Sequence, residues 1–115
     1  MTERASSIRL SPAEALAQLP GPVGERFVGV FRHGSLEVEY YAPRGVDPQE
    51  PHSRDELYVV VSGRGEFVHD GERTTFAPGD CLFVAAGVDH RFESFSDDFG
   101  AWVFFYGPEG GEGAW

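Results

Sequence analysis

The stretch ELYVVVSGRGEFVHDGERTTF, residues 56–76, decides the fold class of this chain. It begins with a run of β-branched and aromatic residues that is typical of a buried strand. A glycine-rich turn at 62–65 leads into a second short strand, and Asp70-Gly71 is a strong signal for a tight hairpin into a third. Short strands joined by tight turns predict an antiparallel β structure.

The same texture continues on both sides of this stretch. Leu36, Val38 and Tyr40 alternate with Glu37 and Glu39, which is the period-2 pattern of a strand with two unlike faces. Further short apolar runs are separated by Gly, Pro and Asp turns, and we expect strands at 26–32, 36–41, 56–61, 66–69, 72–76, 81–84, 90–95 and 101–106. Eight or so short strands predict an all-β, single-domain jelly-roll β-barrel.

Alternation alone leaves the orientation of two strands open. Either Trp102, Phe104 and Tyr106 or the intervening Val103 and Phe105 line the barrel. In the strand at 36–41, the two glutamates either face outward or meet Arg side chains of another subunit. The period of a strand gives two faces without saying which one is buried.

A short helix is expected outside the barrel. Ser11 is a good N-cap, Pro12 suits the first helical position, and Glu14 completes a capping box, while Pro20 ends the segment. We therefore divide the chain into a leader with a short helix at 1–24, a β-barrel at 25–106 and a Gly-rich flexible tail at 107–115.

Composition excludes several classes of function. The chain of 115 residues has 9 Arg and no Lys against 19 acidic residues, for a formal charge of −10. This acid excess argues against nucleic acid and against anionic membranes, which both recruit cationic side chains. No apolar run is long enough for a membrane helix, and the first ten residues show no secretory signal. The single cysteine, Cys81, excludes an internal disulfide and is expected to be a small buried apolar residue, so we expect a reducing, cytoplasmic location.

The candidate site starts from Glu56, which opens an apolar strand and shares one face with Tyr58 and Val60. If that face points inward, the carboxylate must be paired, protonated or bound to a metal. His52 lies four residues earlier, and His90 comes from a distant strand. Two imidazoles and one carboxylate are a donor set for a divalent metal.

Two stretches resemble the two motifs of the cupin superfamily of conserved β-barrels, over roughly residues 35–106. In the first stretch His52, Glu56 and Gly63 match the family pattern in identity and spacing, and in the second Gly79, Gly87 and His90 match. The resemblance implies a cupin-type jelly roll whose metal ligands would be His52, Glu56 and His90.

The chain also departs from the family pattern. The first histidine of the motif is replaced by Glu50, so the usual three histidines and one glutamate become two histidines and one or two carboxylates. A three-ligand site, a fourth oxygen from Glu50 or a contribution from Gln49 remain open. Gly45 is one place off the pattern, and Ala85 and Ser94 replace the family's Pro and Asn.

Three readings follow from the resemblance. The first is a metal-dependent enzyme acting on a small molecule, dioxygenase-like or isomerase-like, with Fe, Mn, Zn or Ni held by the three ligands. In it Glu50, if it is not a ligand, is the best general base, and Tyr58 orients the substrate. The alternative is a non-catalytic small-molecule sensor or carrier, with or without metal; a third reading is a polar cavity that serves only folding.

The oligomeric state is a separate expectation. The barrel has exposed edge strands, and proteins of the family that this chain resembles commonly pair through such edges, so we predict a homodimer.

Overall fold

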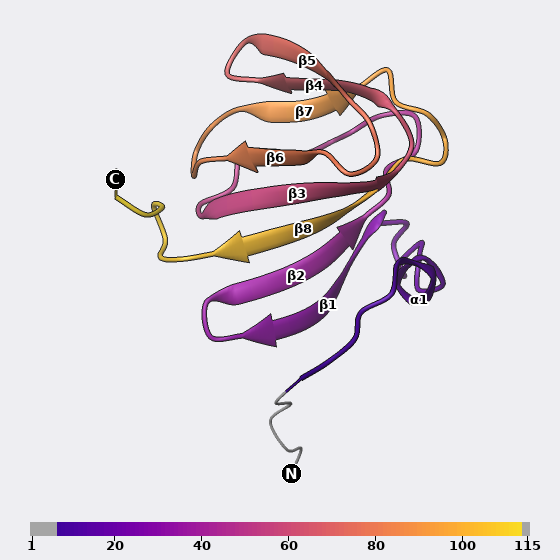
Figure 1. The fold of residues 1–115 in the computed structure, drawn as a ribbon, viewed down its shortest axis with the longest axis horizontal. Helices are drawn as coiled ribbons and strands as arrows, with labels where there is room; N and C mark the ends of the chain where they lie inside the picture. The colour runs from indigo at the N-terminus through magenta and orange to yellow at the C-terminus, as the bar shows by residue number, and fades with distance from the viewer. Residues whose placement is uncertain (1–6, 114–115) are drawn as a thin grey trace.

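The computed structural model describes residues 7–113, whose strands form two antiparallel sheets (Figure 1). The larger sheet has the order β1-β2-β8-β3-β6 and the smaller one β5-β4-β7. The strands are β1 Phe27–His33, β2 Leu36–Tyr41, β3 Asp55–Ser62, β4 Gly65–His69, β5 Glu72–Phe76, β6 Cys81–Val84, β7 His90–Glu93 and β8 Gly100–Tyr106. The predicted all-β jelly roll is confirmed. The first six residues of the predicted leader and the last two of the predicted tail lie outside the described residues.

The expected short helix is α1, Pro12–Leu16. The Ser11 hydroxyl accepts a hydrogen bond from the Glu14 backbone N–H at 3.4 Å, so the predicted cap is present. A helix this short needs a surface to pack on. Tyr40 of β2 and the following Ala42 supply it, because Ala15 of the helix packs against them.

The register of β8 between β2 and β3 settles which side chains face inward. Phe105 lies opposite Glu37 on one side and Glu56 on the other, so these three residues form one row of the inner face. Val103, in the next inward row, is 3% exposed within the main core. Trp102 packs instead with Tyr40 in the separate cluster under α1. The strand therefore lines the barrel with Val103 and Phe105, and β2 turns its glutamates inward rather than outward.

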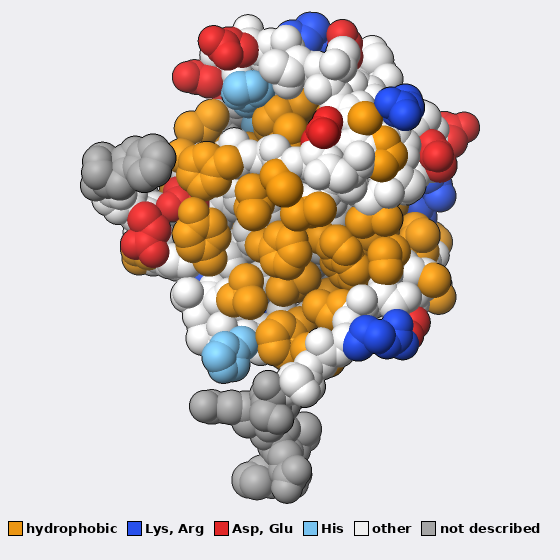
Figure 2. Space-filling model, in the orientation of Figure 1, with side chains coloured by type: hydrophobic (Ala, Val, Ile, Leu, Met, Phe, Trp, Pro, Cys, Tyr) orange, Lys and Arg blue, Asp and Glu red, His pale blue; other side chains and the backbone are white. Residues whose placement is uncertain are grey.

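The outer face of the larger sheet is largely apolar, as the continuous hydrophobic surface in Figure 2 shows. Leu57 and Val59 of β3 lie on this face, beside Phe83 and Cys81 of the edge strand β6. Phe83 is 54% exposed, and Cys81 is exposed as well. The expectation of a buried Cys81 is therefore wrong, because β6 is an edge strand whose outward side chains nothing in the described chain covers.

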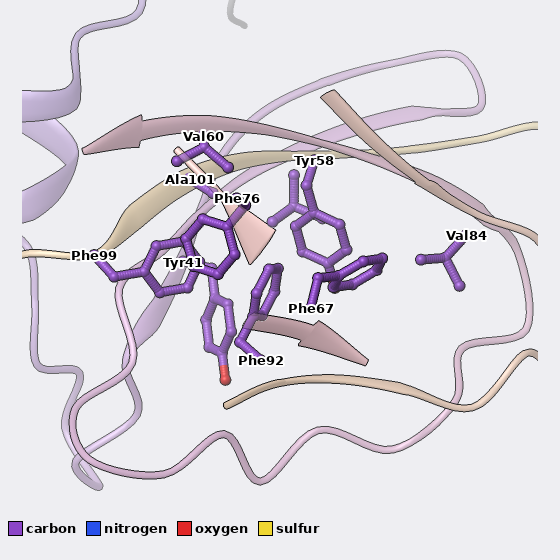
Figure 3. Close-up of a cluster of buried hydrophobic side chains, with 10 residues drawn as sticks. Tyr41, Tyr58, Val60, Phe67, Phe76, Val84, Phe92, Phe99 and Ala101 are labelled. Carbon is purple, nitrogen blue, oxygen red and sulfur yellow. The ribbon is translucent and has the colours of Figure 1, made fainter. Parts of the chain in front are cut away.

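The core between the sheets is aromatic (Figure 3). The Phe92 ring, from β7, lies 5.0 Å from the ring of Tyr58, 5.2 Å from that of Phe67 and 4.7 Å from that of Phe99. Aromatic pairs at such distances contribute about 0.5–1.5 kcal/mol each beyond their burial. These rings fill one part of the barrel interior. The polar residues His52, Glu56 and His90 lie together in the remaining part.

Two glycines shared with the family pattern have different physical roles. Gly63 and Gly79 both have left-handed backbones, with φ of 86° and 92°. A Cβ on Gly63 would lie 2.5 Å from the Cα of Phe99, whereas a Cβ on Gly79 would meet nothing within 4 Å. Gly63 is therefore required by close backbone approach as well as by φ, and Gly79 by φ alone.

We expect Gly63→Ala to destabilise the fold more than Gly79→Ala. Both changes bear the cost of a left-handed alanine, about 1–2 kcal/mol, and Gly63→Ala adds a backbone clash of about 1–3 kcal/mol. Urea denaturation of the two variants measures the difference. Equal losses of unfolding free energy would show that the backbone at 96–99 moves away at no cost and that its close approach to Gly63 does not require glycine.

Candidate metal centre

The structure brings His52, Glu56 and His90 together, as the sequence predicts. Each offers one ligand atom, and these atoms lie within 4.8 Å of one another. The Oε1 atom of Glu56 is 3.1 Å from Nδ1 of His52 and 2.9 Å from Nε2 of His90. The two histidine rings are 5.6 Å apart between centroids. Two imidazoles and a carboxylate in this arrangement can hold a divalent metal ion.

Three different elements supply these side chains. Glu56 is the second residue of β3 and faces inward, paired with Phe105 of β8 and Val84 of β6. His52 lies in the loop before β3, and its ring packs against that of Phe105 at 5.0 Å. His90 opens β7 in the opposite sheet. The site therefore spans the two sheets at one end of the barrel.

The end of the loop that leads into β3 is fixed by Asp55, which lies next to Glu56. Its carboxylate accepts hydrogen bonds from the backbone N–H groups of Ala86, at 2.9 Å, and Glu112, at 2.8 Å. The backbone N–H of Gly110 also donates to the Ser53 carbonyl at 2.7 Å. These bonds tie the start of β3 to the turn before β7 and to the described part of the C-terminal segment.

The His90 ring is oriented by a backbone group. Its Nδ1 lies 2.9 Å from the carbonyl oxygen of Val88, so Nδ1 carries a proton and Nε2 faces Glu56. This is the orientation common among metal-ligating histidines, whose second nitrogen donates to a carbonyl or carboxylate. Burial alone would lower the pKa of His90, but its bonds to Glu56 and Val88 outweigh burial and raise this pKa.

Glu56 has a further feature that fits a cation. Its side chain is only 1% exposed, and its Oε2 atom is buried with no hydrogen-bond partner among the described residues. Burial would raise the pKa of Glu56, but the hydrogen bonds from His52 and His90 prevail and lower it. An ionised, buried oxygen with no donor carries a desolvation cost that a metal ion removes.

Tyr58 is a buried neighbour of the three candidate ligands. It is fully buried, and its hydroxyl donates to Oε1 of Gln49 at 2.8 Å and lies 3.1 Å from Nε2 of His90. Burial, followed by the nearby Glu56 charge, raises the pKa of Tyr58 well above its ordinary value. Tyr58 therefore touches a candidate ligand directly and presents a neutral hydroxyl.

The two candidates for a fourth ligand differ in their surroundings. The Gln49 side chain is held by Tyr58 and by Asp47, to which its Nε2 donates at 2.8 Å. Glu50 is exposed in the same loop. Its predicted role as a fourth ligand or general base stays a prediction.

Sequence reasoning missed Asp47. This buried carboxylate accepts hydrogen bonds from the Tyr41 hydroxyl, from the backbone N–H of Phe92 at 2.8 Å and from both the backbone and the side chain of Gln49. It therefore ties the loop before β3 to β2 and to β7. An aspartate beside Pro48 reads as a turn residue, and nothing in the local sequence marks it as buried.

A cavity of about 630 Å³, within the usual range for small-molecule sites, opens beside His52. Its wall is partly apolar, with Phe27, Tyr41, Val103 and Phe105, and His52 is the one candidate ligand in that wall. The inward-facing glutamates of β2 form part of its floor. Glu37 is paired with Arg54 at 2.8 Å and with Arg32 at 3.2 Å.

Glu39 differs from Glu37 because no hydrogen bond or ion pair joins its carboxylate to another described residue. Burial raises the pKa of Glu39; His52 acts in the opposite direction, and the charges of Glu37 and Glu56 add to the rise. The cavity floor thus holds one neutralised carboxylate and one that is free to accept a ligand's hydrogen bond.

We expect Glu39→Gln to stabilise the metal-free protein at about pH 7 and to have no such effect at about pH 3. Because the pKa of Glu39 is raised on folding, its ionisation costs stability as the pH rises through the folded value. Thermal unfolding in the presence of a chelator measures this.

The matched control is Glu37→Gln, which loses two ion pairs and should lower the unfolding midpoint at about pH 7. A Glu39→Gln protein that is less stable than the wild type at this pH would show that the carboxylate has a stabilising partner.

Comparisons with known proteins agree with the fold and with the family that the sequence resembles. A family profile described as a cupin domain matches residues 37–106. An uncharacterized protein of Streptomyces coelicolor, SCO3923, is 38% identical over 85 residues, which are 72% of this chain and 81% of that protein. The crystal structure of a cupin 2 conserved barrel domain protein from Salinispora arenicola has a TM-score of 0.67 at 22% identity, covering 90% of this chain and 91% of that one.

A second kind of relative is a regulator. The HTH-type transcriptional activator RhaS of Yersinia pestis is 32% identical over 74 residues. That match covers 64% of this chain but only 27% of RhaS.

Within residues 7–113, no helix has the length and apolar character needed to cross a membrane.

Proposed function

Because the chain belongs to the cupin family, we propose that it holds a divalent metal ion with His52, Glu56 and His90 and acts on a small molecule in the adjoining cavity. The observation that carries this proposal is the buried Oε2 atom of Glu56, an ionised oxygen with no donor. Imidazole and carboxylate donors suit Fe, Mn, Zn or Ni. We also propose a cytoplasmic location, as the sequence predicts.

A metal ion bound there would supply Lewis-acid or oxygen-activating chemistry to an oxygen-bearing substrate, as in a dioxygenase or an isomerase. The chain's own residues perform the other tasks. Phe105 packs on His52 and keeps water from one side of that ring. Tyr58 keeps a neutral hydroxyl beside Nε2 of His90, and Glu39 offers a carboxylate oxygen from the cavity floor. We propose Glu50, which is exposed in the loop before β3, as a general base.

The metal centre is tested with protein made without a His tag and incubated with Mn, Fe, Zn or Ni. The wild type should retain one metal ion per chain, whereas His52→Ala, His90→Ala and Glu56→Gln should each lose about a hundredfold or more in affinity, because even partners of ligands are worth roughly 10- to 100-fold. Elemental analysis and a competitive chelator measure this.

The control is His33→Ala, because His33 is an exposed residue at the end of β1. It should bind metal like the wild type. If none of the four metals is retained by folded wild-type protein, or if His33→Ala loses metal as much as His90→Ala does, the assignment is wrong.

A non-catalytic sensor is the second candidate, and the similarity to RhaS favours it. In that case the cavity would bind its ligand without turnover, and metal would serve only to hold it. Oxygen uptake with catechols, diketones and thiols separates the two. Turnover dependent on His90 supports the enzyme, whereas a small molecule that co-purifies unchanged supports the sensor.

We also propose a homodimer that forms through the outer face of the larger sheet. A chain with a charge of −10 repels its own copy, so association is cheapest where charge is absent. The paired outward residues of these strands, Leu57 and Val59 of β3 with Phe83 and Cys81 of β6, are uncharged, and the apolar surface continues across the sheet (Figure 2). Helix α1 covers the part of this face around Tyr40, so the part left for a partner is centred on β3, β6 and the adjoining part of β8.

We expect the wild type to elute at twice its mass of 12.6 kDa and Phe83→Glu to elute as a monomer. Phe83 is 54% exposed, so its replacement should cost little in folding while placing a charge within the interface. Thr74→Glu, on an exposed position of β5 in the other sheet, is the control and should remain dimeric. Light scattering after size exclusion measures the masses; a monomeric wild type or a dimeric Phe83→Glu contradicts the proposal.

A further inference from the structure

The cavity beside the metal centre has an uneven distribution of charge. The chain has about twice as many acidic residues as arginines, so an arginine normally finds a carboxylate. Among the described arginines, Arg32 and Arg54 are paired with Glu37, Arg73 with Glu66 and Glu93, and Arg91 with Glu93. Arg9 is paired with Glu14. Three described arginines have no ion pair, namely Arg26, Arg44 and Arg64, and the first two of them line the cavity.

Backbone carbonyl groups hold these two guanidinium groups instead. Nε of Arg26 donates to the carbonyl oxygen of Ala42 at 2.8 Å, and Nη1 of Arg44 donates to that of Asp97. Bonds to neutral carbonyls fix the side chains, and neither guanidinium group forms an ion pair with Glu25 or Glu109, the two other glutamates of the cavity wall. The nearest acidic neighbour in the chain, Glu25, accepts from the backbone N–H of Val23 at 2.9 Å.

The two charges lie close enough to act on one another. Burial, followed by the charge of Arg44, lowers the pKa of Arg26. Both residues flank the same corner of the fold, because the backbones of Arg26 and Ala42 are joined by an N–H to carbonyl bond at 2.9 Å and Arg44 follows two residues later. An anion placed between two guanidinium groups would relieve this repulsion and accept several charge-assisted hydrogen bonds.

We propose that Arg26 and Arg44 bind the acid group of the cavity's ligand, which is therefore a small organic anion bearing a carboxylate or phosphate. This inference rests on the proposed function, since it places the opposite end of the ligand toward His52 and the metal centre. The apolar wall of Phe27, Tyr41 and Phe105 suits the carbon skeleton between the two ends. Glu37 is already neutralised by its arginines, so Glu39 is the unpaired acid of the β2 floor, where it suits a hydroxyl rather than the acid group.

The test uses the full chain, metal-free, with benzoate, phenyl phosphate and benzamide as probes. Benzamide has the same ring as benzoate but no charge, and phenyl phosphate distinguishes the two kinds of acid group. Calorimetry should show at least one anion binding about tenfold more tightly than benzamide. Arg26→Gln and Arg44→Gln should each weaken that anion about tenfold, as expected for losing a hydrogen bond between charged groups.

Arg64→Gln is the matched control, because Arg64 is exposed, has no ion pair among the described residues and lies outside the cavity. It should leave anion affinity unchanged. Equal affinity for benzoate and benzamide, no binding of either anion, or equal losses in Arg64→Gln and Arg26→Gln would overturn the proposal.

Metal retention, measured separately on the same variants, distinguishes the two proposals. Arginine variants that keep the metal but lose the anion support the anion site. Wild-type protein that binds metal but does not prefer the anion overturns this inference alone. Protein that prefers the anion but retains no metal overturns the metal centre and leaves the anion site supported.

Discussion

The ionised Glu56 side chain, buried between two imidazole rings, is the interaction on which the rest of the site depends. A carboxylate that is 1% exposed carries a desolvation cost of several kcal/mol unless charge and hydrogen bonds offset it. His52 and His90 provide that compensation from one side only, since they share Oε1. The surrounding elements are arranged to maintain this contact. Val88 orients one imidazole, Phe105 packs on the other, and Asp55 fixes the backbone next to the carboxylate.

The polar and apolar parts of the barrel interior depend on one another. Phe92 packs among Tyr58, Phe67 and Phe99 at one end, while its backbone N–H donates to Asp47 and so anchors the loop that leads to His52. Tyr58 belongs to both parts, because its ring lies in the core and its hydroxyl lies beside His90. A substitution in the aromatic cluster would therefore reach the candidate ligands through Tyr58 and β7. The site is positioned by the core rather than by its own contacts alone.

Sequence reasoning predicted the strands and the helix cap because each has a local signal, and it predicted the convergence of three ligands from the spacing of two motifs. Alternation placed Glu56 on one face with Tyr58, and motif spacing linked it to His90 across the chain. The orientation of Glu37 and Glu39 had no such signal, since period-2 alternation is symmetric between inside and outside. Cys81 was misjudged because its edge position depends on the strand order, which the sequence does not contain. Asp47 was missed because its four donors come from segments up to 45 residues away.

The distribution of arginine completes this account of the cavity. In a chain this acidic, most carboxylates have no basic partner, so the positions of the few arginines largely determine the local potential. Arg54 and Arg32 neutralise Glu37 on the floor, and Arg26 and Arg44 leave positive charge at another part of the wall. Between them stand His52 and the unpaired Glu39. The cavity wall therefore carries three arginines and four glutamates beside its apolar residues, and only one of these glutamates, Glu37, is paired with an arginine. A ligand that fits the cavity must carry charge in the complementary arrangement.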